Sequence, residues 1–118
     1  MDVMKRLLLI PLFAFIALTG CDNLDISPDV PECIVSKTKK FKRQAPCDNG
    51  SSVAEYTFQG KKVYTFSQGG DCISDAGSEV VDSDCNNIGY LGGLVGIQEV
   101  NGVNFSSNAV FIRTIWAN

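Results

Sequence analysis

An apolar run near the N-terminus, residues 7–18, restricts this chain more than any other feature. Lys5 and Arg6 precede the run and Pro11 interrupts it. A basic start followed by a short apolar stretch is typical of a secretory signal, whereas a membrane-spanning helix needs roughly 20 apolar residues. The run therefore predicts export, and the folded domain must be built from the residues that follow it.

The apolar run ends in Leu18-Thr19-Gly20-Cys21. A leucine three residues before a cysteine, with small residues between them, is typical of bacterial lipoprotein signals, in which the thiol is acylated before cleavage. We therefore expect residues 1–20 to be a lipoprotein signal peptide and Cys21 to carry the lipid, with acyl chains such as palmitate. Two or more chains hold a protein stably on a membrane. The alternative is an ordinary signal cleaved near Gly20, which leaves Cys21 as a spare thiol.

The residues after Cys21 are mostly small and polar up to residue 30, and they include several aspartates. Such a composition without helical periodicity is typical of a flexible tether. Residues 21–30 are thus expected to be an acylated cysteine and a flexible tether. The expected location is the bacterial cell envelope, where the protein is lipid-anchored in the outer membrane. The domain is expected on either the periplasmic or the surface side of that membrane.

Removal of residues 1–20 leaves 98 residues with eight basic and twelve acidic side chains, a net charge of −4. This length predicts one domain, residues 31–118. An acidic domain is a poor nucleic-acid binder, because phosphate contacts need a basic face. The glycine-rich residues 89–96 lack the lysine and hydroxyl residue of a phosphate-binding loop, so no nucleotide is expected either. We expect no cofactor.

The cysteines form an even set of four once Cys21 is assigned to lipid, and an exported chain favours disulfides. The four are Cys33, Cys47, Cys72 and Cys85. Three pairings are possible, and the shortest loops favour Cys33 with Cys47 and Cys72 with Cys85. Zinc is the alternative, but the chain has no histidine and no Cys-x-x-Cys pair.

A helix is predicted to begin around Pro31 and to end before Ala45-Pro46, with Ile34, Thr38 and Phe41 on one face. Its basic residues are concentrated toward its end: Lys37, Lys39, Lys40, Lys42 and Arg43. One interpretation is a solvated helix end that complements the dipole. The other is contact with anionic headgroups near the anchor.

Residues 53–66 predict a β-hairpin across Gln59 and Gly60. We expect a three-residue loop that includes Phe58, because this register would keep the aromatic residues of the hairpin on one face. The aromatic residues are Tyr56, Phe58, Tyr64 and Phe66, and Ala54 would lie on the same face because it also has an even number.

Three further segments read as β-structure. Residues 79–81 predict a short strand, and residues 97–105 predict a second hairpin that turns at Asn101-Gly102. Residues 109–116 are apolar on both alternating faces, which predicts a central strand. The expected fold class is α+β, with one short N-terminal helix packed on a small, mainly antiparallel sheet and stapled by disulfides.

An acidic segment, residues 71–86, resembles part of a calcium loop. Asp82, Asp84 and Asn86 match its first three ligand positions, but Asn87 replaces the required glycine and Gly93 replaces the closing glutamate. We therefore expect no metal, and these three residues are the only candidates as ligands.

The sequence offers no clear catalytic group, because the chain has no histidine to act as a general base. Glu55, Glu79 and Glu99, together with the aspartates of the acidic loop, are the candidate acid–base carboxylates, and nothing in their spacing predicts that they converge. We expect that the protein is not an enzyme.

From residue 31 to residue 116 the chain carries a set of short motifs spread along its length. They are Pro31-Glu32-Cys33-Ile34, Val53, Glu55-Tyr56, Phe58-Gln59-Gly60-Lys61, Val63-Tyr64, Ser78-Glu79-Val80, Asp82, Cys85-Asn86, Gly89, Leu91-Gly92-Gly93, Asn101-Gly102 and Ile115-Trp116. On these motifs the chain resembles a family of uncharacterised bacterial envelope lipoproteins, a domain of unknown function. The resemblance implies a single cysteine-stapled domain on a lipid anchor and carries no activity with it.

Together these features predict a membrane-anchored envelope lipoprotein that is not catalytic. Its expected partners are the membrane, through the N-terminal lipid, and an envelope protein or glycan that it binds or supports. The alternative is a calcium-dependent glycan binder or a small hydrolase that uses the acidic loop, residues 71–86.

Overall fold

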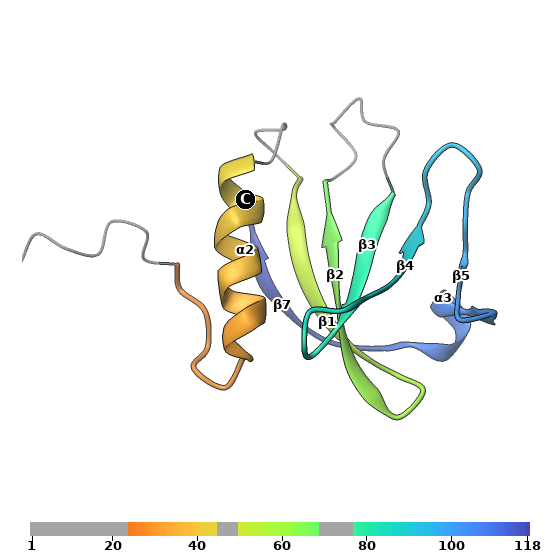
Figure 1. The fold of residues 1–118 in the computed structure, drawn as a ribbon, viewed down its shortest axis with the longest axis horizontal. Helices are drawn as coiled ribbons and strands as arrows, with labels where there is room; N and C mark the ends of the chain where they lie inside the picture. Colours follow the sequence, from red (N-terminus) through yellow and green to blue (C-terminus); the bar gives the residue numbers. More distant parts are fainter. Residues whose placement is uncertain (1–23, 45–49, 69–76) are drawn as a thin grey trace, which may run out of the picture.

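A computed structural model describes residues 24–44, 50–68 and 77–118. Figure 1 shows one N-terminal helix beside a strongly curved sheet. The elements in chain order are α2 (Glu32–Gln44), β1 (Ser52–Phe58), β2 (Lys61–Ser67), β3 (Ser78–Asp82), β4 (Asn87–Leu91), β5 (Glu99–Val100), β6 (Val103–Asn104), the short helix α3 (Phe105–Asn108) and β7 (Val110–Ala117). The sheet order is β4-β3-β2-β1-β7, and all its pairs are antiparallel. The predicted α+β class is confirmed.

Helix α2 forms where the sequence predicts it. Glu32 lies in the first turn and Lys42 and Arg43 in the last, so both ends complement the helix dipole. Ile34 and Thr38 are fully buried against the sheet, and the Thr38 hydroxyl donates to the carbonyl of Ile34 at 2.7 Å. Because the helix backbone accepts a hydrogen bond from this buried hydroxyl, burying the hydroxyl costs little free energy.

No helix of the described residues is long and apolar enough to cross a membrane.

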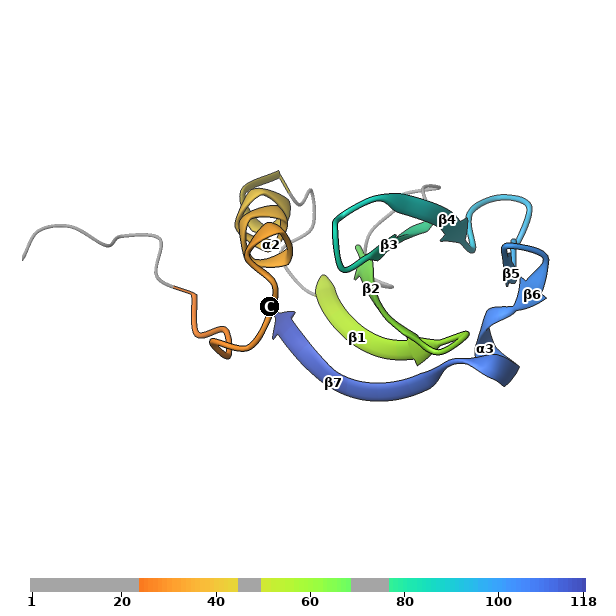
Figure 2. The same cartoon turned by 60° about the horizontal axis from the view of Figure 1, so that its bottom comes forward.

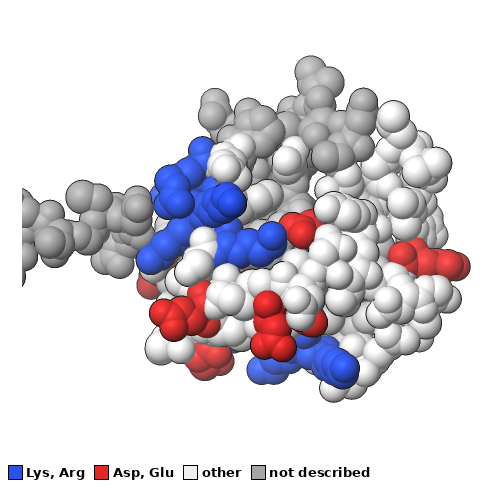
Figure 3. All heavy atoms as spheres, viewed as in Figure 1, with Lys and Arg blue, Asp and Glu red and all other residues white. Residues whose placement is uncertain are grey.

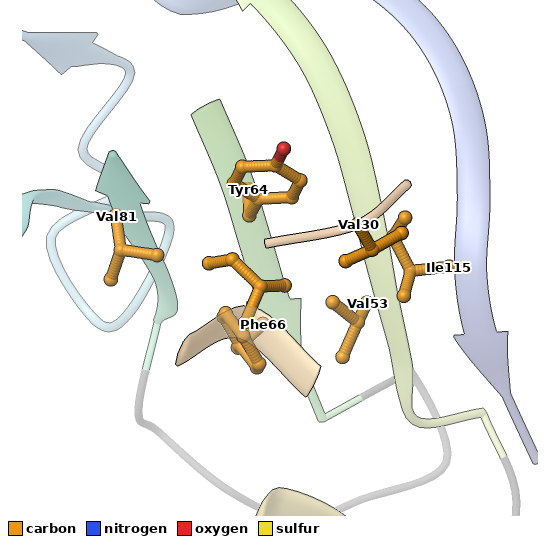
Figure 4. Close-up of a cluster of buried hydrophobic side chains, with 7 residues drawn as sticks. Val30, Val53, Tyr64, Phe66, Val81 and Ile115 are labelled. Atoms are coloured by element: carbon orange, nitrogen blue, oxygen red, sulfur yellow. The ribbon is translucent and has the colours of Figure 1, made fainter. Parts of the chain in front are cut away.

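One face of the sheet packs against α2 and the segment before it. Figure 4 shows side chains from the N-terminal segment and from strands β1, β2, β3 and β7 meeting in this cluster. Its buried members are Val30, Ile34, Val53, Tyr64, Phe66, Val81 and Ile115. Phe41 of α2 closes one end, with its ring edge-on to Phe66 at 5.5 Å and to Trp116 at 6.2 Å between centroids. This cluster fixes the helix on the sheet.

The opposite face encloses a second core. Figure 2 shows the curved sheet with β5, β6 and α3 at the end away from α2. The buried members are Phe58, Val63, Val80, Val100 and Phe105. Gly89 on β4 permits the close approach, because a Cβ at this position would lie 3.3 Å from a methyl group of Val100. The domain therefore has three layers, with the sheet in the middle.

The β1–β2 hairpin differs from the prediction in its turn. Phe58 pairs with Lys61, so Gln59 and Gly60 form a two-residue turn with φ of 52° and 79°. Positive φ at both central positions is the pattern of a type I′ turn, whose twist matches that of the two strands. The predicted three-residue loop is therefore wrong.

This register divides the aromatic residues of the hairpin between the two faces. Tyr64 and Phe66 join the core under α2, whereas Tyr56 and Phe58 join the core under β5, β6 and α3. The prediction assumed one apolar and one polar face. In the structure, distant parts of the chain cover both faces of the hairpin. Aromatic residues on either face are therefore buried.

The last strand, β7, also differs from the prediction. Among the described strands it pairs with β1 alone and ends the sheet, so it is an edge strand and not a central one. Its register with β1 shifts twice, between Val53 and Ala54 and between Glu55 and Tyr56. Such bulges bend and twist an edge strand. The apolar alternation that predicted a central strand reflects contacts with α2 at one end and exposure at the other.

Residues 79–81 and the second hairpin are confirmed as β-structure. β3 contains the predicted strand, and Asn101 and Gly102 turn the β5–β6 hairpin with φ of 56° and 76°. Asn104 then caps α3, because its side-chain oxygen accepts the backbone N–H of Ser107 at 2.9 Å. These local signals were sufficient because each turn is specified by its own residues.

A disulfide joins the start of α2 to the turn after β3. It links Cys33 to Cys85, whose Cα atoms are 6.1 Å apart. The favoured pairing of Cys33 with Cys47 and of Cys72 with Cys85 is therefore wrong, because the fold brings together cysteines that are 52 positions apart. Cys47 and Cys72 lie outside the described residues, so a single staple is observed where two were expected.

The segment from Leu24 to Val30 lies on the domain, whereas the composition predicted a tether. Val30 is buried and Ile26 packs against the same core. Asp29 forms an ion pair with Arg113 of β7 at 3.0 Å. The segment has few apolar residues, but Val30 and Ile26 pack on a hydrophobic surface of the folded domain. This surface cannot be recognised from the sequence alone. Residues 1–23 lie outside the described part of the chain.

Candidate functional site

The predicted site residues fall into three groups. Cys21, Cys47, Cys72 and the first part of the acidic loop up to residue 76 lie outside the described residues. Cys33 and Cys85 form the disulfide described above. The remaining candidates are the end of the acidic loop and three glutamates, and each has a defined place in the fold.

The candidate calcium ligands form a tight turn between β3 and β4. One carboxylate oxygen of Asp82 accepts the backbone N–H groups of Asp84 and Asn86, both at 2.9 Å. The side-chain amide of Asn86 donates to the other oxygen at 3.3 Å. These bonds, above all the one from the Asn86 backbone, lower the pKa of Asp82. The carboxylate therefore closes the turn, and the described residues contain no group of three or more acidic, cysteine or histidine side chains placed to bind a metal.

The three candidate catalytic carboxylates lie on different strands. Glu79 of β3 forms an ion pair with Lys37 at 2.9 Å and accepts from the amide of Asn87 at 3.0 Å. Glu99 of β5 is exposed. Glu55 of β1 is fully buried and has its own cationic partners. The structure thus holds Glu55 and Glu79 in separate ion pairs.

The buried carboxylate of Glu55 lies at the centre of a polar network under α2. Arg113 donates from Nε to one oxygen at 2.5 Å, and the Lys62 ammonium lies 3.4 Å from the other. The Tyr64 hydroxyl donates to that second oxygen at 3.5 Å. Burial, followed by the charge of Glu55, raises the pKa of Tyr64. A buried charge needs such partners, because an unpaired one would be very costly.

Arg113 extends this network to the N-terminal segment. Its two terminal nitrogens donate to the two oxygens of Asp29 at 3.1 and 3.0 Å, a bidentate geometry. The hydrogen bond from Arg113 lowers the pKa of Asp29 to about 2, with a further contribution from Ser27. Asp29, and then Glu55, raise the pKa of Arg113. One guanidinium therefore connects β1, β7 and the chain before α2.

Sequence reasoning missed this network. The available signal was a charged residue inside each of two largely apolar strands, Glu55 in β1 and Arg113 in β7. A buried position is rare for an unpaired charge, so two such residues of opposite sign are candidates for a pair. Nothing in the sequence, however, shows that β1 and β7 are neighbours.

The network and Val30 cover only the C-terminal half of β7, and the N-terminal half remains exposed. Val110, Phe111 and Ile112 are 64%, 56% and 41% exposed. Three consecutive large apolar residues on the surface of a small domain are unusual, and an apolar patch of this kind often marks an interaction site. We call these three residues the β7 patch.

An aromatic stack supports the β7 patch from inside the domain. The Phe111 ring is edge-on to Tyr56 at 5.7 Å, and Tyr56 is edge-on to Phe105 at 5.1 Å. Phe105 in turn contacts Phe58 in the second core, at 5.0 Å between ring centroids. Such edge-to-face pairs add stability beyond simple burial. Phe111 is thus exposed and yet held in one orientation.

The two bulges in β7 determine how the patch can be used. A regular edge strand can accept another strand through its backbone, but bulges and charged residues interrupt such pairing. Between the bulges β7 keeps only short regular stretches, and Arg113 interrupts its apolar run. The patch is therefore suited to contact through side chains and poorly suited to strand addition.

A second exposed apolar group lies at the turn between β4 and β5, where Leu94 and Val95 project into solvent. The glycines on both sides of them, Gly93 and Gly96, have positive φ. No aromatic contact in the described residues supports this turn, so it lacks the fixed geometry of the β7 patch.

The basic residues of α2 form a third feature. Leu24, Lys39, Lys42 and Arg43 line a shallow cavity of about 110 Å³. Figure 3 shows that blue side chains gather over the helix, while most red ones lie below them. Lys37, by contrast, points to Glu79 on the sheet. The basic run is thus divided between an internal ion pair and an open surface.

Comparison with known proteins gives one result. No curated protein and no solved structure matches the chain. Residues 39–118, which include all the described strands, match a domain of unknown function, DUF6970. Because the match covers more than half of the sequence, the chain belongs to the DUF6970 family.

Proposed function

We propose that this protein is a lipid-anchored, non-catalytic module of the bacterial cell envelope that binds a protein partner through the β7 patch. The observation that carries the proposal is the exposure of Val110, Phe111 and Ile112 on an edge strand whose other half is covered. A fixed aromatic residue among aliphatic neighbours is typical of the centre of a protein interface.

The fixed orientation of Phe111 is the first support for a binding role. A side chain that is ordered before binding loses less conformational entropy when a partner arrives. The stack through Tyr56 and Phe105 supplies this order. Phe111 is therefore the residue expected to contribute most to binding.

The neighbours of Phe111 favour a protein over a glycan. A sugar ring can stack on an aromatic side chain, but its hydroxyl groups also need polar partners beside the ring. Val110 and Ile112 offer only aliphatic groups on either side. Because side chains alternate along a strand, Phe111 lies on the side opposite Val110. The proposed partner is therefore a protein with an apolar groove that encloses the edge of β7 and contacts both sides of it.

The envelope location rests on the sequence and on one covalent bond. Leu18-Thr19-Gly20-Cys21 follows an apolar run of signal-peptide length. The disulfide between Cys33 and Cys85 is suited to an oxidising compartment outside the cytoplasm. The proposed anchor is the acylated thiol of Cys21, in the outer membrane.

The non-catalytic part of the proposal rests on the use that the fold makes of its carboxylates. Glu55 and Glu79 are both engaged in ion pairs with side chains of other elements, and Asp82 closes a turn. The chain contains no histidine that could act with them. The same use of Asp82 weakens the alternative of a calcium-dependent glycan binder.

The test is photo-crosslinking in intact cells. A photoreactive phenylalanine analogue replaces Phe111 in one strain and Glu99, an exposed residue of β5, in a control strain. A discrete crosslinked protein that appears only from position 111 supports the proposal. Crosslinks of equal yield from both positions, or none from position 111, would contradict it.

A matched pair of variants then measures the contribution of the patch. Phe111→Ser with Ile112→Ser should weaken binding of the crosslinked partner at least about tenfold, as expected for the centre of an interface. Leu94→Ser with Val95→Ser removes two exposed apolar side chains elsewhere and should leave binding unchanged. Thermal unfolding of both variants shows that each is folded.

A further inference from the structure

We infer that the C-terminal half of α2 lies against the headgroups of an anionic membrane, with Lys39 and Lys42 directed toward the lipid. The inference rests on the proposed acylation of Cys21 and deepens it, because it assigns an orientation to the anchored domain.

Chain length gives the first constraint. Only three residue steps separate Cys21 from Leu24, and a fully extended chain covers at most about 3.6 Å per residue. The Cα atom of Leu24 therefore lies within roughly 11 Å of the Cα atom of the acylated cysteine, whatever path the chain follows. An anchored Cys21 keeps Leu24 close to the membrane interface.

The position of Leu24 on the domain gives the second constraint. Leu24 lines the same cavity as Lys39, Lys42 and Arg43 of α2. The residues that follow are held on the domain, because Val30 is buried and Asp29 binds Arg113. The start of the described chain cannot move far from α2 while these contacts persist. The basic half of the helix must therefore stay near the membrane as well.

Charge decides which lipid this surface would meet. Electrostatic attraction at physiological ionic strength extends over about 8 Å, which is comparable to the longest reach from Cys21 to Leu24. Lys42 is exposed and Lys39 half-buried, and neither has a carboxylate partner among the described residues. Figure 3 shows the concentration of positive charge on this side of the domain. Anionic headgroups complement that charge.

This orientation leaves the β7 patch free. Figure 1 shows β7 beginning beside α3, at the end of the sheet away from α2, and running back toward the helix. The residues of the patch are the first three of the strand. A domain that rests on the membrane through α2 therefore presents the patch away from the anchor, where a protein partner can reach it.

The test uses the full acylated chain, extracted from membranes and reconstituted into two kinds of vesicle. One contains phosphatidylethanolamine with phosphatidylglycerol, and the other contains phosphatidylcholine alone. An amine-reactive reagent and peptide mass spectrometry report the labelling rate of each lysine. We expect Lys39 and Lys42 to react about fivefold more slowly in the anionic vesicles, as expected for lysines at an anionic surface. Lys61, at the β1–β2 turn, should react at the same rate in both.

Variants of equal charge test the location of the effect. In the wild type, anionic vesicles should slow the hydrogen exchange of the α2 peptide relative to phosphatidylcholine vesicles. Lys39→Gln with Lys42→Gln should abolish this slowing. Lys40→Gln with Lys61→Gln removes the same number of charges and should retain it. Equal behaviour of the two variants would overturn the inference.

Other results are equally decisive. Equal labelling of Lys39, Lys42 and Lys61 in both vesicles, or protection that requires an added envelope protein and not anionic lipid, overturns the orientation. Intact mass of the same sample reports acylation separately. An unmodified Cys21 would therefore refute the proposed anchor, whereas acylated protein without lysine protection would refute only the orientation.

Discussion

Arg113 donates a hydrogen bond from Nε to the buried carboxylate of Glu55 at 2.5 Å and so connects the edge strand β7 to β1. The same guanidinium binds Asp29 with its two terminal nitrogens. A residue of the edge strand thus neutralises a charge in the interior and holds the segment that leads to the proposed anchor. The stability of the domain and the placement of its N-terminal segment are coupled through this side chain.

The first prediction concerns the loss of this guanidinium. Arg113→Ala should reduce the free energy of unfolding by about 3 kcal/mol, because it leaves a buried carboxylate with only weaker partners. Lys62, at 3.4 Å, is mostly exposed, and Tyr64 is 3.5 Å away. Urea unfolding at neutral pH measures the change.

A second variant separates the charge from the packing. In a Glu55→Gln background the buried negative charge is absent, so Arg113→Ala should cost less by about 1 to 2 kcal/mol than it does in the wild type. Purely additive effects of the two substitutions would show that the pair contributes no coupling energy.

A third variant addresses pH. The pKa of Asp29 is about 2 in the folded protein against an ordinary value of 3.8. The stability from its pair with Arg113 is therefore complete above about pH 4 and is lost as the pH falls through about 2. The difference in unfolding free energy between wild type and Asp29→Asn should be constant from neutral pH down to about 4 and should shrink below it.

The control for this pH dependence is Asp25→Asn. It removes the same charge from an exposed neighbouring position for which the structure describes no ion pair. Its stability should parallel that of the wild type at all pH values. If Asp29→Asn also parallels the wild type between pH 4 and 2, the ion pair makes no contribution in solution.

The cysteine pairing gives a further prediction. Peptide mapping without reductant should recover Cys33 linked to Cys85, and never Cys33 linked to Cys47. If all four cysteines after Cys21 are oxidised, the remaining pair is Cys47 with Cys72 by elimination. Cys33→Ser with Cys85→Ser opens a loop of 52 positions. Chain-entropy reasoning for a loop of that length gives a loss of about 4 kcal/mol, which thermal or urea unfolding would measure.

The last prediction concerns the β1–β2 turn. Gln59 has a positive φ of 52°, where asparagine is better tolerated than glutamine. Gln59→Asn should stabilise the domain by about 0.5 kcal/mol. Gly60→Ala should destabilise it by about 1 kcal/mol through backbone strain alone, because a Cβ at this position would meet nothing within 4 Å. No change in either variant would contradict the type I′ turn.

The outcomes for the predicted elements follow one physical distinction. The helix and the second hairpin depended on residues close together in the chain, such as Glu32 at a helix start and Asn101 beside Gly102. Those predictions are confirmed. The position of β7 in the sheet and the partner of Cys33 depended on residues more than 50 positions away. Both of those predictions are wrong.

The candidate site divides in the same way. The sequence shows three apolar residues at positions 110–112 but gives no sign that they are exposed, because a central strand and an edge strand have the same alternation. It shows Glu55 and Arg113 but not that they meet. Only the pairing of β1 with β7 brings the charges together and leaves Phe111 at the surface.

The sequence by itself thus determined the even set of cysteines after Cys21, helix α2 and the turn of the second hairpin. The tertiary structure decided which cysteines bond, which faces of the hairpin are buried and which strand is the edge. The physical reason is that turns and caps are satisfied by neighbours in the chain. Burial and charge pairing depend on surfaces that exist only once distant segments have packed together.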